Sequence, residues 1–369
     1  MMNKKKPLIG LLGASVLAGG AYAFVRNIYG GSKFLDSYVD KVSKIDVNST
    51  FELEEDGYYA IRKTDNKPFR VLQLTDIHIG GGYLSRHEDM QALRIVQRAI
   101  ASTKPDLIVV TGDIACAKAH ISLSRNNLNC FRILTNLLEN IGIPYAITFG
   151  NHDADGRCIY KRRELADYVS KREHSLMVET EKTEGITGFS NYLVKLRNKN
   201  GKLNSVIYML DSNEYIKVEQ KKTYDYIHKD QVEWYASETI RINSEEGRNV
   251  PSHLFFHIPL REYNDAWNAV INADKSAEYY YGSRDEAISC SKSDSELFDK
   301  VLELDSTKGI FCGHDHLNDF SVSYKGIRLT YGQGIDCLLY AKNLSEHKGA
   351  TLLKIHKNGD FEIKGKKHR

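Results

Sequence analysis

The sequence lacks the paired cysteines of a zinc-ribbon protein. Its six cysteines, at positions 116, 130, 158, 290, 312 and 337, include no CxxC pair. Because structural zinc sites commonly take their thiolates from such pairs, this spacing argues against a zinc ribbon. We expect most of these cysteines to be small buried residues. The alternative is that an oxidising compartment allows one or two disulfides to form.

The sequence also lacks a large excess of positive charge, internal repeats and low-complexity tracts. The net charge is +3, and residues 1–30 contribute four basic residues and no acidic residue. The remaining chain therefore carries a net charge of −1, which argues against a general nucleic-acid surface. Residues 353–369 hold six basic and two acidic residues, and we interpret them as a solvated strand end.

The N-terminal segment contains a long run without charge. Lys4, Lys5 and Lys6 precede 18 uncharged residues from Leu8 to Val25. A membrane-spanning helix needs about 17–25 such residues, so residues 1–25 are predicted to be a signal anchor or a cleaved signal peptide. Either interpretation places the body outside the cytoplasm, membrane-anchored or secreted. Residues 26–50 are predicted to be a linker, and residues 51–369 a folded domain.

Apolar runs alternate with helical patterns in the first part of this domain. Three segments are predicted to be buried strands: FRVLQLTD (69–76), DLIVVTGD (106–113) and IPYAITFGNHD (143–153). Between them, residues 89–102 and 129–142 carry apolar side chains at helical spacing, and Gly142 is expected to end the second helix. Strands separated by helices predict a largely parallel sheet with both faces covered.

The second part of the domain has a different order of elements. We expect antiparallel strands at 191–196 and 205–212, helices at 229–243 and near 294–304, a strand at 253–260, and hairpins at 320–332 and 349–365. Residues 264–295 lack clear periodicity, so a long loop is predicted there. Its Tyr279-Tyr280-Tyr281 run either stacks on a substrate ring or packs against the body.

Five apolar segments are each followed by a short polar cluster. Each cluster alone has a simpler explanation, because an aspartate after a strand is commonly a turn or capping residue. A single histidine there is commonly a hydrogen-bonded core residue. In an open α/β sheet, however, the carboxyl ends of the strands line a shared crevice. The occurrence of all five clusters therefore favours one site: TDIH (75–78), TGD (111–113), GNHD (150–153), FHIP (256–259) and GHDH (313–316).

The residue types in these clusters suit a pair of metal ions. Their carboxylate and amide oxygens and imidazole nitrogens fit Mn, Fe or Zn better than Ca, and the absence of thiolates argues against structural zinc. One carboxylate can bridge two ions at about 3.5–4 Å, the spacing of two-metal hydrolases. The candidate ligands are Asp76, His78, Asp113, Asn151, His257, His314 and His316.

The motifs DxH, GD, GNH[DE], H and GHxH occur here in the order of the calcineurin-like metallophosphoesterase superfamily, which the chain resembles over about residues 70–332. Within this superfamily, the chain is similar to the branch of purple-acid-phosphatase-like and Dcr2-type phosphatases in the segments LQLTDIHIG, HIPL, GHDHLNDF and YGQG. The resemblance implies a four-layer α/β/β/α sandwich of two mixed sheets flanked by helices. Purple acid phosphatases carry DxG and GDxxY, whereas His78 and Cys116 stand at those positions here. We therefore expect no iron-tyrosinate site, and we expect Cys116 to pack as a small apolar residue or, alternatively, to lie near the metals as a thiolate.

The resemblance also implies a role for each site residue. His152 would lie beside the metals and protonate the leaving alkoxide or hold a phosphate oxygen, the alternative being a purely structural histidine. Asp153 would support the loop that carries Asn151 and His152. Asp76, His78 and His316 would bind the first ion, Asn151, His257 and His314 the second, and Asp113 would bridge them.

These roles predict a dinuclear-metal-dependent phosphoesterase in which a metal-bound hydroxide attacks phosphorus in line, without a covalent enzyme intermediate. A phosphomonoester is the favoured substrate, and a phosphodiesterase or nuclease is the alternative. A catalytically inactive metal-binding scaffold is a further alternative. It is disfavoured because such a protein is expected to lose ligand positions, whereas this chain has a suitable residue at each.

Overall fold

The first sheet has buried aliphatic strands at its centre and an exposed edge strand, β16 (Phe361–Lys367). The computed structural model describes residues 19–23, 25–30, 35–339 and 348–367. Within these ranges the sheet has the order β16-β15-β3-β4-β5, formed by β3 (Phe69–Leu74), β4 (Leu107–Thr111), β5 (Tyr145–Thr148), β15 (Gly349–Ile355) and β16 (Phe361–Lys367). β3, β4 and β5 are parallel, and β15 is antiparallel to β3. Every residue of β4, LIVVT, is buried, as expected for a parallel strand covered on both faces.

The second sheet is larger and mixed. In the described part of the chain its order is β1-β2-β6-β7-β10-β12-β14-β13-β11. Its strands are β1 (Ser49–Leu53), β2 (Tyr59–Lys63), β6 (Tyr192–Arg197), β7 (Leu203–Met209), β10 (Ser252–Phe255), β11 (Ala277–Tyr281), β12 (Thr307–Cys312), β13 (Ser321–Tyr324) and β14 (Ile327–Tyr331). β7, β10, β12 and β14 run parallel at its centre. A separate hairpin consists of β8 (Tyr215–Val218) and β9 (Lys221–Tyr224).

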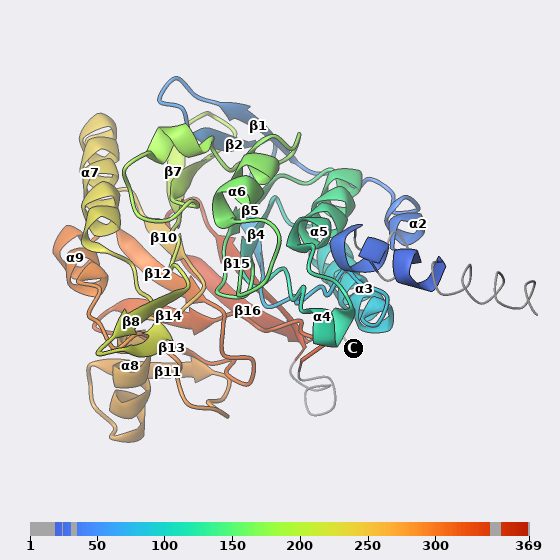
Figure 1. Cartoon of the computed structure of the whole chain (residues 1–369). Helices are drawn as coiled ribbons and strands as arrows, with labels where there is room; N and C mark the ends of the chain where they lie inside the picture. Colours follow the sequence, from blue (N-terminus) through green and yellow to red (C-terminus); the bar gives the residue numbers. More distant parts are fainter. Residues whose placement is uncertain (1–18, 24, 31–34, 340–347, 368–369) are drawn as a thin grey trace, which may run out of the picture.

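Helices cover the outer faces of the two sheets. They are α2 (Asp36–Val39), α3 (Arg86–Thr103), α4 (Ala119–Ser122), α5 (Asn127–Ile141), α6 (Arg162–Ser170), α7 (Lys229–Glu246), α8 (Glu262–Ile271), α9 (Leu297–Leu304) and a 3-10 helix at Thr180–Thr183. Figure 1 shows α3 and α5 on one side of the sheets and α7 and α9 on the other. The predicted four-layer α/β/β/α sandwich is therefore confirmed.

Local signals explain where the helices begin and end. The side chain of Asn126 accepts a hydrogen bond from the amide of Asn129 at 2.9 Å and so caps the start of α5. Gly142, with φ of 77°, ends that helix in the left-handed conformation, as predicted. The predicted antiparallel pair and both C-terminal hairpins are also present, as β6 with β7, β13 with β14, and β15 with β16.

The predicted long loop at 264–295 is wrong in part, because the helix α8 and the strand β11 occupy much of this segment. α8 buries only Tyr263 and Ala266, so its apolar pattern is weak. β11 is an edge strand that pairs with β13, and most of its side chains are exposed. Tyr279 is 49% exposed, and its ring lies 6.4 Å from that of Trp267 on α8. An edge strand has one partner and little buried area, which removes the alternation that periodicity detects.

Most of the predicted anchor or signal peptide, residues 1–25, lies outside the described residues, and its role stays a prediction. Among the helices that the structure describes, none is both long and apolar enough to cross a membrane. Part of the segment predicted as a linker, residues 26–50, packs on the body. Leu35 and Val39 are buried, and the amide of Ile45 donates to the carbonyl of Ile141 at 2.9 Å. All six cysteines lie within the described residues and are free thiols.

Candidate metal centre

The carboxyl ends of strands from both sheets meet at one place. Gln73 on β3 donates to the carbonyl of Cys312 on β12 at 2.9 Å. His257, just beyond β10, contacts the carbonyl of Thr111 at the end of β4 at 2.8 Å. These contacts join the two sheets where the polar clusters follow their strands. The structure therefore brings together the strand ends that sequence analysis had grouped from separate parts of the chain.

The loops that carry the candidate ligands have an unusual backbone. Asp76, His78, Asp113 and His314 have φ values of 51°, 51°, 50° and 79°, in the left-handed region. Residues other than glycine adopt this conformation at a cost of about 1–3 kcal/mol each, at helix ends and turns as well as in clusters at functional sites. The strained loops support one another, since the amide of His78 donates to the carbonyl of Asp113 at 3.0 Å. Four such residues therefore lie together in the loops that carry the candidate ligands.

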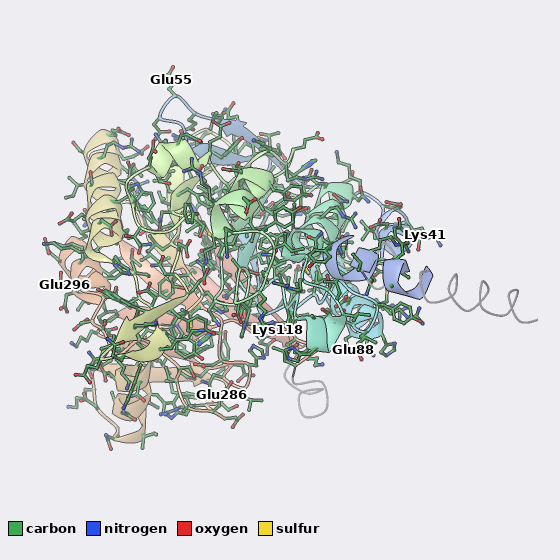
Figure 2. The ribbon with its side chains drawn as sticks, viewed as in Figure 1. Lys41, Glu55, Glu88, Lys118, Glu286 and Glu296 are labelled. Carbon is green, nitrogen blue, oxygen red and sulfur yellow. The ribbon has the colours of Figure 1, made fainter. Side chains whose placement is uncertain are left out.

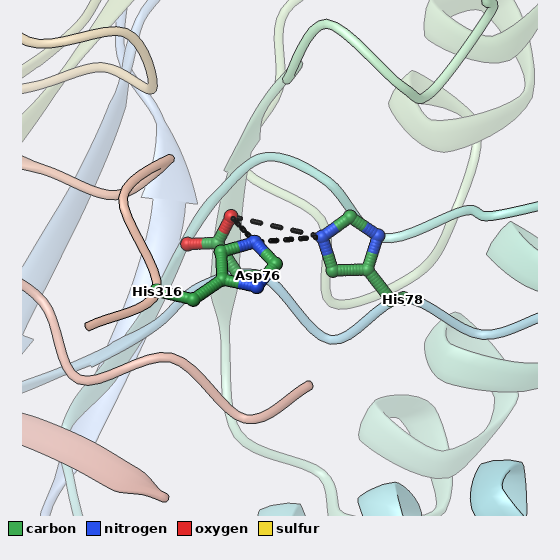
Figure 3. A group of neighbouring side chains, drawn as sticks. All are labelled: Asp76, His78 and His316. Atoms are coloured by element: carbon green, nitrogen blue, oxygen red, sulfur yellow. Dashed lines mark hydrogen bonds and ion pairs between the residues drawn. The ribbon is translucent and has the colours of Figure 1, made fainter. Parts of the chain in front are cut away.

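The first cluster consists of Asp76, His78 and His316, whose ligand atoms all lie within 4.8 Å of one another (Figure 3). The two Nε2 atoms of His78 and His316 are 3.1 Å apart, and Asp76 Oδ1 lies 3.4 Å from His316 Nε2. Asp76 Oδ2 accepts hydrogen bonds from the Thr75 hydroxyl and the His314 amide, at 2.7 and 3.0 Å. This orientation leaves Oδ1 directed into the cluster.

Glycine makes the approach of the His314 loop to Asp76 possible. A Cβ atom at Gly313 would overlap the Thr75 hydroxyl and the Asp76 carboxylate. Because glycine has no Cβ, the backbone can come within hydrogen-bond distance of Asp76. The close packing of this loop against Asp76 therefore explains why the GHDH motif begins with glycine.

The second cluster contains Asp113, His257 and His314, with ligand atoms again within 4.8 Å of one another. His257 Nε2 lies 3.3 Å from Asp113 Oδ2, 3.3 Å from His314 Nδ1 and 3.2 Å from Asn151 Oδ1. With a proton on Nδ1, His257 donates to the carbonyl of Thr111, and its Nε2 presents a lone pair to the cluster. Asn151 therefore joins this group through its amide oxygen.

Asp113 lies between the two clusters. Its Oδ2 atom is 3.6 Å from His78 Nε2 in the first cluster and 3.3 Å from His257 Nε2 in the second. Its Oδ1 atom accepts a hydrogen bond from the amide of His152 at 2.8 Å. Although burial raises the pKa of the Asp113 carboxyl, the neighbouring His257 and His152 hold it well below its usual value. The side chain is thus an anion placed where both clusters can share it.

The donor set fits a pair of cations. Within the described residues, Asp76 Oδ1 and His314 Nε2 are buried without a hydrogen-bond partner. Burial lowers the pKa of His78 to about 4 and that of His314 to about 3, so both imidazoles are neutral and keep a lone pair for a ligand. Although burial lowers their pKa values, Asp113 raises the pKa of His257 to about 9, and Asp336 and Asp76 raise that of His316, so in these two imidazoles a proton occupies the position that a cation would take. A mixed set of carboxylate, imidazole and amide ligands suits Mn, Fe or Zn.

His152 and Asp153 lie next to the clusters rather than in them. The ring of His152 is 5.6 Å from the ring of His78, and its Nδ1 lies 2.9 Å from Asp155 Oδ2 and 3.1 Å from Lys118 Nζ. Asp153 accepts hydrogen bonds from the amides of Asp113, Ala115 and Gly150, at 3.1, 2.8 and 2.8 Å. The carboxylate of Asp153 therefore ties the GNHD loop to the loop after β4.

Sequence analysis missed several residues that support the site. Asp336 Oδ2 lies 3.2 Å from His316 Nδ1, which directs the Nε2 atom of that histidine to the first cluster. Asp336 follows β14 in YGQGID, and this is the same strand-end signal that identified the other clusters. Tyr215 accepts a hydrogen bond from the Asn151 amide nitrogen at 2.9 Å, so the amide oxygen faces His257. No signal in the sequence links Tyr215 to Asn151.

The hairpin β8–β9 covers the second cluster. The rings of Tyr215 and Tyr224 stack with centroids 5.5 Å apart, and the ring of Tyr224 meets that of His314 edge-on at 4.4 Å. Buried Arg162 ties the chain entering this hairpin to the GNHD loop, because it pairs with Asp211 and donates to the carbonyls of Gly150 and Asn213 at 2.6 and 2.8 Å. The two aromatic rings therefore form a fixed wall beside the second cluster.

Cys116 behaves as a small core residue. It is fully buried, and burial raises the pKa of its thiol to about 12, which keeps it protonated at neutral pH. Within the described residues, neither ligand cluster includes Cys116. The structure thus favours the packing role over a thiolate near the metals.

Fold and site together define a dimetal phosphoesterase architecture. A model of the calcineurin-like phosphoesterase family matches residues 69–318, and the chain belongs to this family.

Among individual proteins, the chain is 29% identical over 336 residues to "Probable inactive purple acid phosphatase 28" of Arabidopsis thaliana, covering 84% of this chain and 80% of that one. It is 28% identical over 297 residues to "Phosphatase DCR2" of Saccharomyces cerevisiae, covering 75% of this chain and 50% of that one. A crystal structure of a dimetal phosphatase from Danio rerio has a TM-score of 0.52 and 12% identity, covering 81% of this chain and 96% of that one. These similarities confirm the resemblance drawn from the motifs.

Proposed function

We propose that this protein hydrolyses phosphate monoesters with the help of two divalent cations held by the two clusters. The observation that carries the proposal is the position of Asp113 Oδ2, which lies within 3.6 Å of an imidazole in each cluster. A single carboxylate shared by two clusters of nitrogen and oxygen donors is the arrangement a dinuclear centre needs. Asp76, His78 and His316 would hold one cation, Asn151, His257 and His314 the other, and Asp113 both.

The cations would supply neutralisation of the phosphate charge and activation of water. The remaining tasks fall to residues of the chain. His152 would carry a proton on Nε2 and deliver it to the leaving-group oxygen, while Asp155 accepts a hydrogen bond from Nδ1 and so holds the ring in place. Lys118, whose Nζ lies 3.4 Å from Asp155 Oδ2, places a positive charge beside the same ring. Tyr215 would keep the oxygen of Asn151 turned to its cation.

The names of three Arabidopsis relatives, purple acid phosphatases 28, 29 and 14, contain the words "probable inactive". A metal-binding protein without turnover is therefore the second candidate. Two features of this chain support activity instead: the clusters include every predicted ligand, and a histidine paired with a carboxylate lies beside them. A bound metal pair alone requires no such histidine.

The test combines metal analysis with an activity screen. Protein stripped by a chelator is reloaded separately with Mn, Fe, Zn or Mg, and phosphate release is measured from phosphomonoesters and phosphodiesters. We expect two metal ions per chain and turnover of monoesters that disappears with the chelator. Two bound metals without turnover of either class would establish the scaffold. A higher kcat/KM for diesters than for monoesters would establish a phosphodiesterase.

We also propose that residues 1–25 hold this domain outside the cytoplasm, as the lysines and the uncharged run in the sequence predict. Protease added to intact cells should then digest the domain or, if the segment is cleaved, the domain should occur in the medium. A domain that is protected in intact cells and absent from the medium would contradict this localisation.

A further inference from the structure

A pocket of about 570 Å³ lies beside His152, outside the two metal-ligand clusters. Three segments form most of its wall: the loop after β4 with Lys118 and His120, the turn before α5 with Arg125, and the end of the GNHD loop with Asp155 and Arg157. Figure 2 shows Lys118 next to α4. We call this hollow the basic pocket.

The basic pocket carries more positive than negative charge. Lys118, Arg125 and Arg157 line it, and Asp155 is the acidic residue in its wall. Asp155 is already engaged, because its Oδ2 lies 2.9 Å from His152 Nδ1 and 3.4 Å from Lys118 Nζ. Among the residues that the structure describes, no carboxylate forms an ion pair with Arg125 or Arg157. Two guanidinium groups therefore face the pocket without a balancing charge.

Backbone contacts hold these two arginines together. Arg125 Nε donates to the carbonyl of Arg157 at 2.6 Å, and the amide of Ile159 donates to the carbonyl of Arg125 at 3.0 Å. The contact through Nε leaves the terminal nitrogens of Arg125 available to a ligand. Guanidinium groups bind phosphate and carboxylate with paired, charge-assisted hydrogen bonds. The held guanidinium of Arg125, with the exposed side chain of Arg157 next to it in the pocket wall, is an anion-binding arrangement.

The basic pocket lies next to the histidine that is proposed to protonate the leaving group. Lys118 and Asp155 line the pocket and also contact His152 Nδ1, so the pocket and the reaction centre share one wall. In the proposed reaction His152 protonates the leaving-group oxygen. Lys118 and Asp155 contact Nδ1, whereas the leaving group meets Nε2. A leaving group that passes the edge of the imidazole therefore reaches Arg125 and Arg157.

We propose that the basic pocket binds a second anionic group carried by the leaving group, so that the substrate class is small phosphate esters with an additional phosphate or carboxylate. This inference rests on the proposed phosphatase function. Arg125 and Arg157 hold the second anion. Lys118, which lines the pocket and also contacts His152, places its positive charge between this anion and the reaction centre. Small phosphate esters without a second anion are hydrolysed too, but they make no use of this contact.

The first experiment compares three substrates of equal chain length: an alkyl monophosphate, an alkanediol bisphosphate and an ω-carboxyalkyl phosphate. Each is measured as a series of two to about eight carbons, since the reach to the pocket sets the optimum. We expect kcat/KM for the best bisphosphate to exceed that for the matched monophosphate by about tenfold or more, mainly through KM. The carboxylate series shows whether the pocket requires phosphate or accepts either anion.

Two variants locate the effect. Arg157→Ala removes an exposed side chain and should lower the bisphosphate-to-monophosphate ratio of kcat/KM about tenfold, with the monophosphate rate unchanged. Arg125→Lys keeps the charge but loses the planar pair of donors and should lower the ratio by a smaller factor. Arg62→Ala on β2, which removes an equal charge away from the pocket, is the matched control and should leave the ratio unchanged.

The outcomes separate this inference from the proposed function. Equal kcat/KM for mono- and bisphosphates, together with no change in Arg157→Ala, would overturn the basic pocket while leaving phosphatase activity intact. If no ester is hydrolysed, the same bisphosphates and monophosphates are titrated into the metal-loaded protein by calorimetry, and their affinities test the basic pocket. Binding that is tighter than for the monophosphates and weakened in Arg157→Ala supports the pocket, whereas equal binding overturns it.

Discussion

Replacement of His253 by leucine should change the dependence of stability on pH by a calculable amount. His253 lies on β10 at 0% exposure, against the rings of Phe361 and Phe311 at 5.0 and 6.2 Å. Neither of its ring nitrogens has a hydrogen-bond partner among the described residues. Burial alone lowers its pKa from 6.5 to about 3, so the folded protein holds this imidazole neutral across most of the acid range.

The sign follows from proton linkage. The unfolded chain binds a proton at His253 as the pH falls below about 6.5, and the folded chain does not until about pH 3. The parent protein therefore loses stability relative to His253→Leu between these values, by about 1.36 kcal/mol per pH unit. From about pH 7.5 to about pH 5 the difference in unfolding free energy between the two proteins should grow by about 2 kcal/mol in favour of leucine.

Urea unfolding followed by tryptophan fluorescence measures this difference at both pH values, with chelator present so that metal affinity does not enter. Leucine is close to histidine in volume, and it also removes two unsatisfied polar atoms from the core. His87→Leu, at an exposed position on α3, is the matched control for loss of an imidazole. A difference between parent and His253→Leu that stays constant from pH 7.5 to pH 5, within about 0.5 kcal/mol, would refute the view that His253 is buried and unprotonated.

Three further substitutions test the proposed centre. Asp113→Asn keeps the acceptor for the His152 amide but removes the shared charge, so metal content should fall below two ions and kcat should be nearly lost; parental kcat at equal metal content would contradict the bridging role. His152→Ala should retain both metals and lower kcat about 10²–10⁴-fold, more for alkyl than for nitrophenyl esters, because a good leaving group needs no proton; metal loss would instead make His152 a ligand. Tyr215→Phe frees the amide of Asn151 and should weaken metal binding about 10–100-fold by calorimetric titration, whereas Tyr226→Phe, with its ring on His228, should not; equal metal affinity in both would exclude the positioning role.

The sequence grouped the candidate metal ligands because their signal is local. Asp76, Asp113 and Asn151 each follow a run of buried aliphatic residues, and such runs end at the edge where side chains of parallel strands meet. The order of strands in the sheets was not needed to group them. The loops around the ligands also repeat short motifs, and these motifs supported the family.

What the sequence did not predict depends on contacts between distant segments. Tyr215 reaches Asn151 because Arg162 ties the start of the β8–β9 hairpin to the GNHD loop, an arrangement with no local pattern. The basic pocket likewise joins Arg125 and Arg157 through a backbone contact between separate loops. β11 was missed for a different reason: an exposed edge strand buries too little to alternate. Local sequence therefore identified the candidate ligands, while tertiary packing determines which residues surround them.

Each cluster draws residues from both sheets. Asp76 and His78 follow β3 of the smaller sheet, and His316, 238 residues beyond His78, follows β12 of the larger one. A cation held there would join residues of the two sheets that lie far apart along the chain. Filling the centre should consequently stiffen the seam between the sheets more than the interior of either sheet. Amide hydrogen exchange along β3, β4, β10 and β12 would then slow with added metal, even though most of these amides lie too far from the ligands to touch an ion.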